Sequence, residues 1–135
     1  MRFVDTNVLL YAVSGEPAED RKREVARFIL GQRDLAFSAQ VLQEFYVQST
    51  RPGRSRPLTH QEATDYVLVF ARFTVQPITV ALVSAAKATG RRFGVSYWDA
   101  AIIEGARLMD CAEVLSEDLQ HGQDSDGVVV VDPFR

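Results

Sequence analysis

Four consecutive valines, Val128-Val129-Val130-Val131, decide the fold class of this 135-residue chain. A short apolar run without alternation is typical of a strand that is covered on both faces, as in a parallel sheet flanked by helices. Similar runs earlier in the chain predict buried strands over residues 2–4, 35–37, 73–75 and 113–115. We therefore expect a mainly parallel central sheet of about five strands.

Longer amphipathic stretches lie between these runs and predict helices. Pro17 and Gly31 mark the start and end of one helix, over residues 17–30. Thr59-His60-Gln61-Glu62 has the pattern of a capping box, which predicts a helix to about residue 72. Further helices are expected over 39–49, 79–90 and 96–109. Alternating strands and helices predict a three-layer α/β/α sandwich with right-handed crossovers.

Length and composition indicate one globular domain over residues 1–135. The Pro/Gly-rich segment 51–57 leaves too few residues on either side for two domains. Apolar residues make up 47% and charged residues 24%, which excludes disordered and collagen-like classes. The net charge of −3 gives no overall basic field, so a phosphate-bearing partner must be held locally.

The chain carries no signal for a membrane or for secretion. It has no apolar run of transmembrane length, and Asp5 and Asn7 interrupt the only segment near the start that is similar to a signal peptide. The lone cysteine, Cys111, cannot form an internal disulfide and is expected to be a small core residue. We expect a cytoplasmic protein.

Four acidic residues fall where parallel strands of such a sheet end. Asp5 directly follows the first strand, Asp118 comes shortly after the fourth, and Glu44 lies on the helix after the second. Ligands of open α/β sheets bind beyond the carboxyl ends of the strands, so these three side chains are expected to meet there. Asp99, in the first turn of the last predicted helix, joins them if that helix begins at the same edge.

Clustered carboxylates repel one another, and a divalent cation removes the conflict. A ligand set made only of oxygens favours Mg²⁺ or Mn²⁺ over zinc. Such ions activate water and stabilise the charge that develops on a phosphodiester. The sequence offers no other catalytic set, because it has no nucleophile elbow, no phosphate loop with lysine and no Cys/His zinc spacing.

Each acid also has an ordinary structural explanation. Asp99 can favour the start of a helix, and Asp118 can cap one. Asp5 can form an Asx-turn, and Glu44 can be a partly solvated helix residue. Taken singly, these explanations are the better ones for every acid except Asp5. The expected shared location of the four reverses the balance.

Five motifs, in order along the whole chain, resemble those of the PIN-domain nucleases. They comprise an opening strand and turn, three further acidic motifs and a terminal strand, namely DTNVLL at 5–10, SAQVLQEF at 38–45, YWDAAI at 97–102, SEDL at 116–119 and VDPF at 131–134. Two positions depart mildly from the family pattern. Ser116 stands where Thr is common, and Asp132 stands where Asn often precedes Pro-Phe.

This resemblance implies a Mg²⁺- or Mn²⁺-dependent endoribonuclease. Because a metal-activated water would attack the phosphorus, we expect products with 5′-phosphate and 3′-hydroxyl ends. It implies metal ligation by Asp5, Glu44, Asp99 and Asp118, with Asn7 and Ser116 as hydrogen-bonding groups behind them. The short length is similar to that of VapC-type toxins of bacterial toxin–antitoxin pairs. That likeness implies an RNA substrate, a cognate antitoxin as partner and a homodimer.

Several exposed-looking residues have two explanations each. Arg51, Arg54 and Arg56 share one loop, where they can hold RNA phosphates or be ordinary solvated charges. Trp98 can stack on a base, although packing in the core or in a dimer interface is the more ordinary expectation.

Two other functions stay open. A phosphatase of the haloacid-dehalogenase type would use Asp5 as nucleophile, but it needs an acid two residues later, where this chain has Asn7. A PIN module that binds RNA or protein without catalysis is the second, and the presence of all four acids argues against it.

Overall fold

The computed structural model describes all 135 residues and is built on a six-stranded sheet in the order β3-β2-β1-β4-β6-β5. Five strands run parallel: β1 (Arg2–Val4), β2 (Leu35–Ser38), β3 (Thr74–Gln76), β4 (Glu113–Leu115) and β6 (Val128–Val131). The sixth, β5 (Asp124–Ser125), pairs antiparallel with β6. The predicted sheet is therefore confirmed, with one short strand more than the five expected.

The position of β1 in the middle of the sheet determines where a site can form. Phe3 of β1 pairs with Ala36 of β2, and Val4 of β1 pairs with Leu115 of β4. Because both pairings are parallel, the carboxyl ends of the three strands lie at the same edge of the sheet. The residues that follow these strands are therefore brought together.

All the predicted helices are present, and several begin at a side-chain cap. Ser38, Thr59, Thr79 and Ser96 each accept a hydrogen bond from the backbone N–H three residues later. None of the helices has both the length and the apolar character that crossing a bilayer requires. The helices are α1 (Thr6–Ala12), α2 (Asp20–Leu30), α3 (Ala39–Thr50), α4 (His60–Phe70), α5 (Val80–Phe93) and α6 (Tyr97–Leu108), with a 3₁₀ turn η1 (Pro17–Glu19) before α2.

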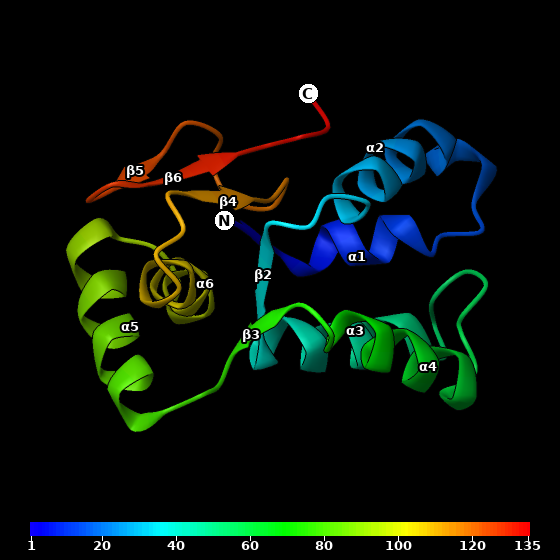
Figure 1. Cartoon of the computed structure of the whole chain (residues 1–135), viewed down its shortest axis with the longest axis horizontal. Helices are drawn as coiled ribbons and strands as arrows, with labels where there is room; N and C mark the ends of the chain where they lie inside the picture. The colour runs from blue at the N-terminus through cyan, green and yellow to red at the C-terminus, as the bar shows by residue number, and fades with distance from the viewer.

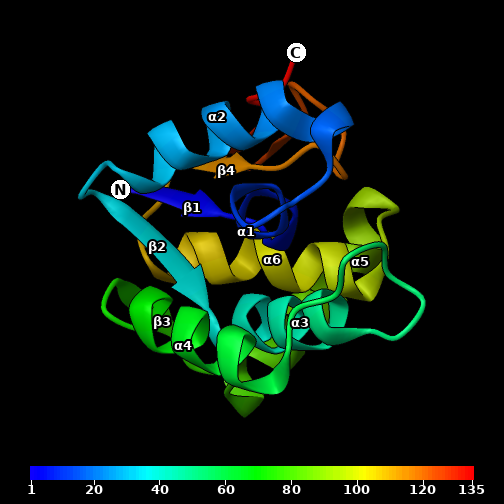
Figure 2. The same ribbon diagram turned by 90° about the vertical axis from the view of Figure 1, so that its right-hand side faces the viewer.

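The helices cover both faces of the sheet, which gives the expected three-layer sandwich. Figure 2 shows α2 on one side of β1 and β4 and α6 on the other. In Figure 1, α5 lies outside α6, and α3 and α4 lie side by side below the sheet. The interior is apolar and tightly filled, with the rings of Phe3, Phe37 and Phe45 fully buried. Cys111 is buried in the same core, as predicted.

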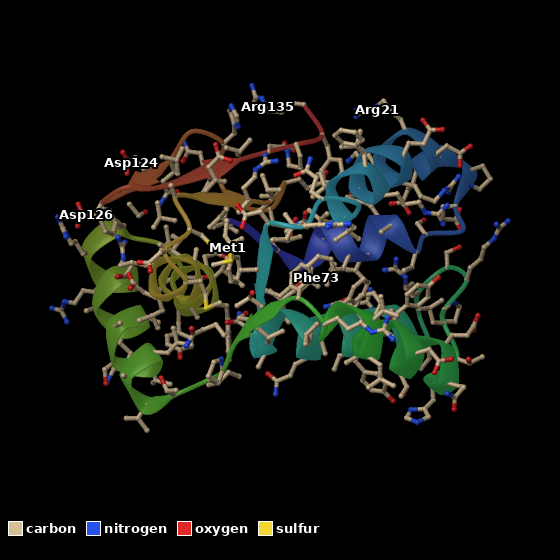
Figure 3. The ribbon with its side chains drawn as sticks, in the orientation of Figure 1. Met1, Arg21, Phe73, Asp124, Asp126 and Arg135 are labelled. Atoms are coloured by element: carbon tan, nitrogen blue, oxygen red, sulfur yellow. The ribbon has the colours of Figure 1, made fainter.

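Two elements depart from the prediction. Residues 5–10 were expected to form a strand end and a turn, but Thr6–Ala12 forms helix α1, which Asp5 caps by accepting a hydrogen bond from the Thr6 N–H. The extra strand β5 belongs to a tight hairpin in which Asp126 and Gly127 have positive φ angles of 52° and 91°. Figure 3 shows Asp124 and Asp126 together at this end of the molecule.

Candidate active site

Asp5 lies where β1 ends and α1 begins, and the residue is only 5% exposed. Its carboxylate accepts hydrogen bonds from the Thr6 N–H at 2.8 Å, the Ser116 hydroxyl at 2.7 Å and the Asn7 side-chain amide at 3.5 Å. The first of these bonds caps helix α1 and is not the Asx-turn that the sequence allowed, which would bond the backbone two residues on. The bond from Ser116 connects Asp5 to the loop after β4. The bond from Asn7 holds the carboxylate against the first turn of α1.

Asn7 and Ser116 join the loop after β4 to the start of α1. The Asn7 amide donates to the Ser116 hydroxyl oxygen at 3.1 Å and to Asp118 Oδ2 at 3.2 Å, and its carbonyl oxygen accepts from the Glu117 N–H at 3.3 Å. The Ser116 oxygen also accepts from the Asp118 N–H at 3.1 Å. Both residues therefore lie directly behind Asp5 and Asp118.

Glu44 reaches this edge on α3, which begins at Ser38 where β2 ends. Its carboxylate accepts from the Thr6 hydroxyl at 2.8 Å and from the Gln40 amide, one turn earlier, at 3.0 Å. Thr6 was missed by the sequence analysis, although it contacts both Asp5 and Glu44. No local pattern could have indicated it, because its contact with Glu44 depends on how α1 packs against α3.

Asp118 lies in the loop after β4, where no helix begins. It therefore does not cap a helix, which was the alternative explanation for this residue. The neighbouring Glu117 is bound by the Tyr11 hydroxyl and by Lys22 Nζ, the latter at 2.7 Å. Lys22 Nζ also lies 4.8 Å from the centre of the Tyr11 ring. This cluster, which the sequence analysis also missed, anchors the loop that carries Asp118.

The pKa of Asp5 is raised from 3.8 to about 6. Burial is the main cause; the hydrogen bonds from Ser116 and Thr6 lower the pKa, and the negative charges of Glu44 and Asp118 raise it. None of these three carboxylates takes part in a salt bridge. The group therefore concentrates negative charge at one point, and no basic side chain of the chain is in direct contact with it.

The carboxylate of Asp99 stands apart from this group. Asp99 is the third residue of α6, where its backbone N–H donates to Ser96 Oγ at 3.1 Å, but its side chain makes no hydrogen bond or salt bridge. Glu62 has the same position in α4, and its carboxylate accepts from the Thr59 N–H to complete a capping box. Asp99 thus contributes no side-chain cap to its helix.

The first turn of α6 nevertheless begins next to Glu44. Gln40 donates both to the Glu44 carboxylate and, at 3.4 Å, to the backbone carbonyl of Trp98. Asp99 is the next residue along the chain. The structure therefore brings Asp5, Glu44 and Asp118 together and places Asp99 beside them without a direct contact.

The chemistry of these side chains suits a hard divalent cation. The donors are all oxygens, and none of these carboxylates is in a salt bridge, which is the setting that Mg²⁺ and Mn²⁺ favour. As the side chains stand, no three His, Cys, Asp or Glu residues converge closely enough to enclose an ion. The expected ligands are thus gathered at one edge but are not in ligating positions.

A cavity of roughly 560 Å³ opens in front of the acids. Glu44 and Asp118 line one part of it, and Arg51 and Arg54, from the loop after α3, line another. Arg56 is not part of this lining, because its guanidinium donates to the Gly15 carbonyl and lies 3.9 Å from Glu16. An anionic chain bound in the cavity would meet two arginines beside the carboxylates.

Trp98 and both histidines of the chain lie on the surface. Trp98 is 65% exposed, so it does not pack in the core. Packing in a dimer interface, the other half of that expectation, stays a prediction. His60 and His121 are exposed: His60 Nδ1 shares a hydrogen bond with the Tyr46 hydroxyl, and His121 Nδ1 accepts from the Asp132 N–H. Neither histidine lines the cavity in front of the acids.

The family model described as PIN domain matches residues 2–123. Among solved structures, the chain is similar to a toxin–antitoxin complex from Klebsiella pneumoniae, with 18% identity, a TM-score of 0.73 and 98% of each chain covered. It is also similar to VapC20 of Mycobacterium tuberculosis, described as a toxin that cleaves the sarcin–ricin loop, with 19% identity, a TM-score of 0.66 and 87% of this chain and 92% of that chain covered.

A third similar structure is VapBC2 from Rickettsia felis bound to a promoter DNA fragment, with 12% identity, a TM-score of 0.63 and 96% of each chain covered. At these identities the likeness to solved structures shows the fold. No curated protein matches the chain in a comparison of sequences.

Proposed function

The chain belongs to the PIN-domain family, and from that premise we propose that it is a Mg²⁺- or Mn²⁺-dependent endoribonuclease and the toxin of a toxin–antitoxin pair. The observation that carries the proposal is Asp5. Its carboxylate is buried, has a pKa of about 6, and is flanked by Glu44 and Asp118, none of the three being in a salt bridge. A buried carboxylate next to two more exposed ones is costly to the fold, and Glu44 and Asp118 line a cavity beside it, which together indicate a functional site.

In this proposal Asp5, Glu44, Asp99 and Asp118 would hold the ion. A divalent cation at such a site supplies water activation and neutralises the charge that develops on the phosphodiester. Through their hydrogen bonds, Asn7, Ser116 and Thr6 fix the orientation of the carboxylates that they contact. The chain's own contribution is therefore to hold several carboxylates at one point of the sheet edge.

Arg51 and Arg54 would hold RNA phosphates in the same cavity. Arg56 is left out of this role, because it is already bound to the Gly15 carbonyl and lies outside the lining. We expect products with 5′-phosphate and 3′-hydroxyl ends. The alternative route through the RNA 2′-hydroxyl needs a general acid and a general base, and no histidine lines the cavity to serve as either.

The partners belong to the proposal as well. The similar structure from Klebsiella pneumoniae is a toxin–antitoxin complex, and the one from Rickettsia felis is VapBC2 bound to DNA. These likenesses support a cognate antitoxin here. Exposed apolar side chains on α3 and α4, such as Tyr46, Val47 and Leu68, give a partner or a second copy a surface to cover. We place the protein in the cytoplasm, where RNA and antitoxin are both available.

The test is cleavage of RNA by purified protein with Mn²⁺ or Mg²⁺ and with EDTA. We expect EDTA to abolish cleavage. Asp5→Asn, Glu44→Gln, Asp99→Asn and Asp118→Asn should each reduce it by at least the roughly 10–100-fold that loss of a supporting hydrogen bond costs at metal sites. Asp65→Asn, an exposed acid on α4, is the matched control and should cut like the parent.

Three outcomes would contradict parts of the proposal. Normal cleavage by any three of the four variants would mean that the site is misplaced. Products that end in 2′,3′-cyclic phosphate would exclude attack by water. A protein that binds RNA but never cuts it with either cation would be a binding module instead.

The phosphatase alternative has a test of its own, and the structure weakens it. A trapped phosphoenzyme on Asp5 would support it. That mechanism needs a general acid at the position of Asn7, whose amide instead donates to Ser116 and Asp118.

A further inference from the structure

A second cavity adjoins the acidic one on the other side of Glu44. Its volume is roughly 380 Å³, and it is lined by Gln40, Gln43, Glu44, Val47, Gln48 and Trp98. Glu44 and Gln48, which lie one turn apart on α3, line both cavities. An extended ligand can therefore occupy both cavities at once by crossing α3 at this turn.

The indole of Trp98 forms one wall of the second cavity and is both accessible and fixed. The residue is 65% exposed, whereas tryptophan is on average highly buried in folded proteins. The Trp98 ring contacts the Tyr97 ring edge to face, with the centroids 5.1 Å apart. The backbone carbonyl of Trp98 accepts a hydrogen bond from the Gln40 side chain. An exposed ring held in this way is a platform on which another flat ring can stack.

The remaining lining provides polar groups that are free to bind. The side-chain amides of Gln43 and Gln48 make no hydrogen bond within the chain, so each offers two N–H donors and one carbonyl acceptor. Val47 adds an apolar surface. Single-stranded RNA is recognised by this combination, since its bases stack on aromatic rings and their edges bind donors and acceptors.

We propose that this cavity binds a nucleobase of single-stranded RNA, stacked on Trp98 and contacted at its edge by Gln43 and Gln48. The inference rests on the proposed ribonuclease function, because it assigns the base that lies next to the bond to be cut. The adjoining phosphate then lies in the acidic cavity, where Arg51 and Arg54 also line the wall. Trp98 therefore contributes to the affinity for substrate, and Gln43 and Gln48 contribute to the choice of base.

A second copy of the chain is a less suitable occupant of this cavity. It would bury the charge of Glu44 and the amides of Gln43 and Gln48 against protein, which destabilises a complex unless each group finds a partner. The neighbouring cavity between α3 and α4 has a far more apolar lining, with Leu42 and Leu68 among its residues, and fits a protein surface better.

Intrinsic fluorescence tests the proposal directly, because Trp98 is the only tryptophan in the chain. The parent protein is titrated with a short unstructured oligoribonucleotide in EDTA, so that no cleavage occurs. We expect saturable quenching of the Trp98 emission. An abasic oligomer with the same number of phosphates should leave the emission unchanged, since it keeps the charges and lacks the rings.

Variants measure how much the ring contributes to binding. With a labelled oligoribonucleotide, Trp98→Ala should weaken binding roughly tenfold or more, the effect of losing one stacked base. Trp98→Phe should keep most of the affinity, because a phenyl ring also stacks. Phe28→Ala removes an aromatic side chain that is 75% exposed on α2, away from both cavities, and should bind like the parent.

Two results would overturn the proposal. One is equal binding by Trp98→Ala and the parent. The other is a Trp98 emission that changes with protein concentration but not with RNA, which would mean that a second copy covers the ring.

These results are separable from failure of the proposed function. Protein that shows RNA-dependent quenching but never cuts RNA with Mn²⁺ would refute the ribonuclease and leave the base site standing.

Discussion

Asp5 makes the stability of the metal-free protein depend on pH. Its pKa in the folded state, about 6, is higher than the 3.8 of an unperturbed carboxyl, so folding favours the protonated form. The stability that this group contributes is fully present below about pH 4 and is lost as the pH rises through about 6. The difference between these two pKa values corresponds to a loss of about 3 kcal/mol in the free energy of unfolding.

We therefore expect the free energy of unfolding in EDTA, measured with urea between about pH 4 and pH 7, to fall in the parent and to stay level in Asp5→Asn. Asp65→Asn should follow the parent, because Asp65 is exposed. If the parent and Asp5→Asn lose the same amount over this range, Asp5 is not the group that titrates.

Asp99 gives a second prediction, because its carboxylate makes no bond in the metal-free fold. In EDTA, Asp99→Asn should change the free energy of unfolding by no more than about 0.5 kcal/mol, as surface changes do, and the melting temperature should change little. The same substitution should reduce the rise in melting temperature that Mn²⁺ gives the parent, since an ion that binds only the folded state stabilises it by mass action. Thermal melts with EDTA and with Mn²⁺ measure both effects.

Ser96→Ala is the control for this comparison. It removes the cap of α6 and should lower stability by about 1 kcal/mol. Because it leaves the Asp99 carboxylate in place, it should keep the response to Mn²⁺. A parent protein whose melting temperature ignores millimolar Mn²⁺ would leave the metal site without support.

The sequence could predict three of the four acids together because their placement follows from the strands. Asp5 and Asp118 come after parallel neighbours, and Glu44 lies on a helix entered from a third. The distance from Asp99 to the others depends on how the first turn of α6 meets α3. That placement arises from the packing of side chains far apart in sequence, and no local pattern encodes it.

The hairpin of β5 and β6 allows a test that separates stability from activity. Gly127 has a φ of 91°, and a Cβ added there would touch nothing within 4 Å, so the strain of Gly127→Ala would lie in the backbone alone. We expect this change to lower stability by about 1 kcal/mol. Cleavage should be unchanged, because the hairpin lies at the amino end of β6, opposite the edge that carries Asp118.

Gly53→Ala is the matched substitution for the melting experiment, since Gly53 also has open space around it and does not have a positive φ. It should leave the melting temperature unchanged or slightly higher. Equal melting temperatures for Gly127→Ala and the parent would contradict the strain argument.

The elements themselves were predicted unevenly, for identifiable reasons. The bounds of β1, β4 and β6 agree with the prediction because each contains at least two consecutive apolar residues and ends where a polar residue follows. Helix α1 was missed because its buried side chains include polar Thr6 and Asn7, which hide its apolar face in the sequence. Strand β5 has only two residues, both polar, although the pair Asp126-Gly127 is a recognised hairpin signal.

The molecule as a whole is expected to form a homodimer. Apolar side chains are exposed on α3 and α4. A second copy of the chain or an antitoxin would remove them from contact with water. Light scattering at micromolar concentration should therefore give a mass twice the 15.1 kDa of the chain. A mass of one chain over the whole concentration range would contradict the homodimer.

The order in which the site comes together has a consequence for synthesis of the protein. Ser116 contacts Asp5, and Asn7 contacts Asp118, across 111 positions of the chain in each case. While a ribosome is still adding residues, the segment that bears Asp5 emerges long before β4 exists to complete its surroundings. On the proposed function, an unfinished polypeptide lacks a working centre, so the chain that is still being made cannot cut the messenger RNA that encodes it.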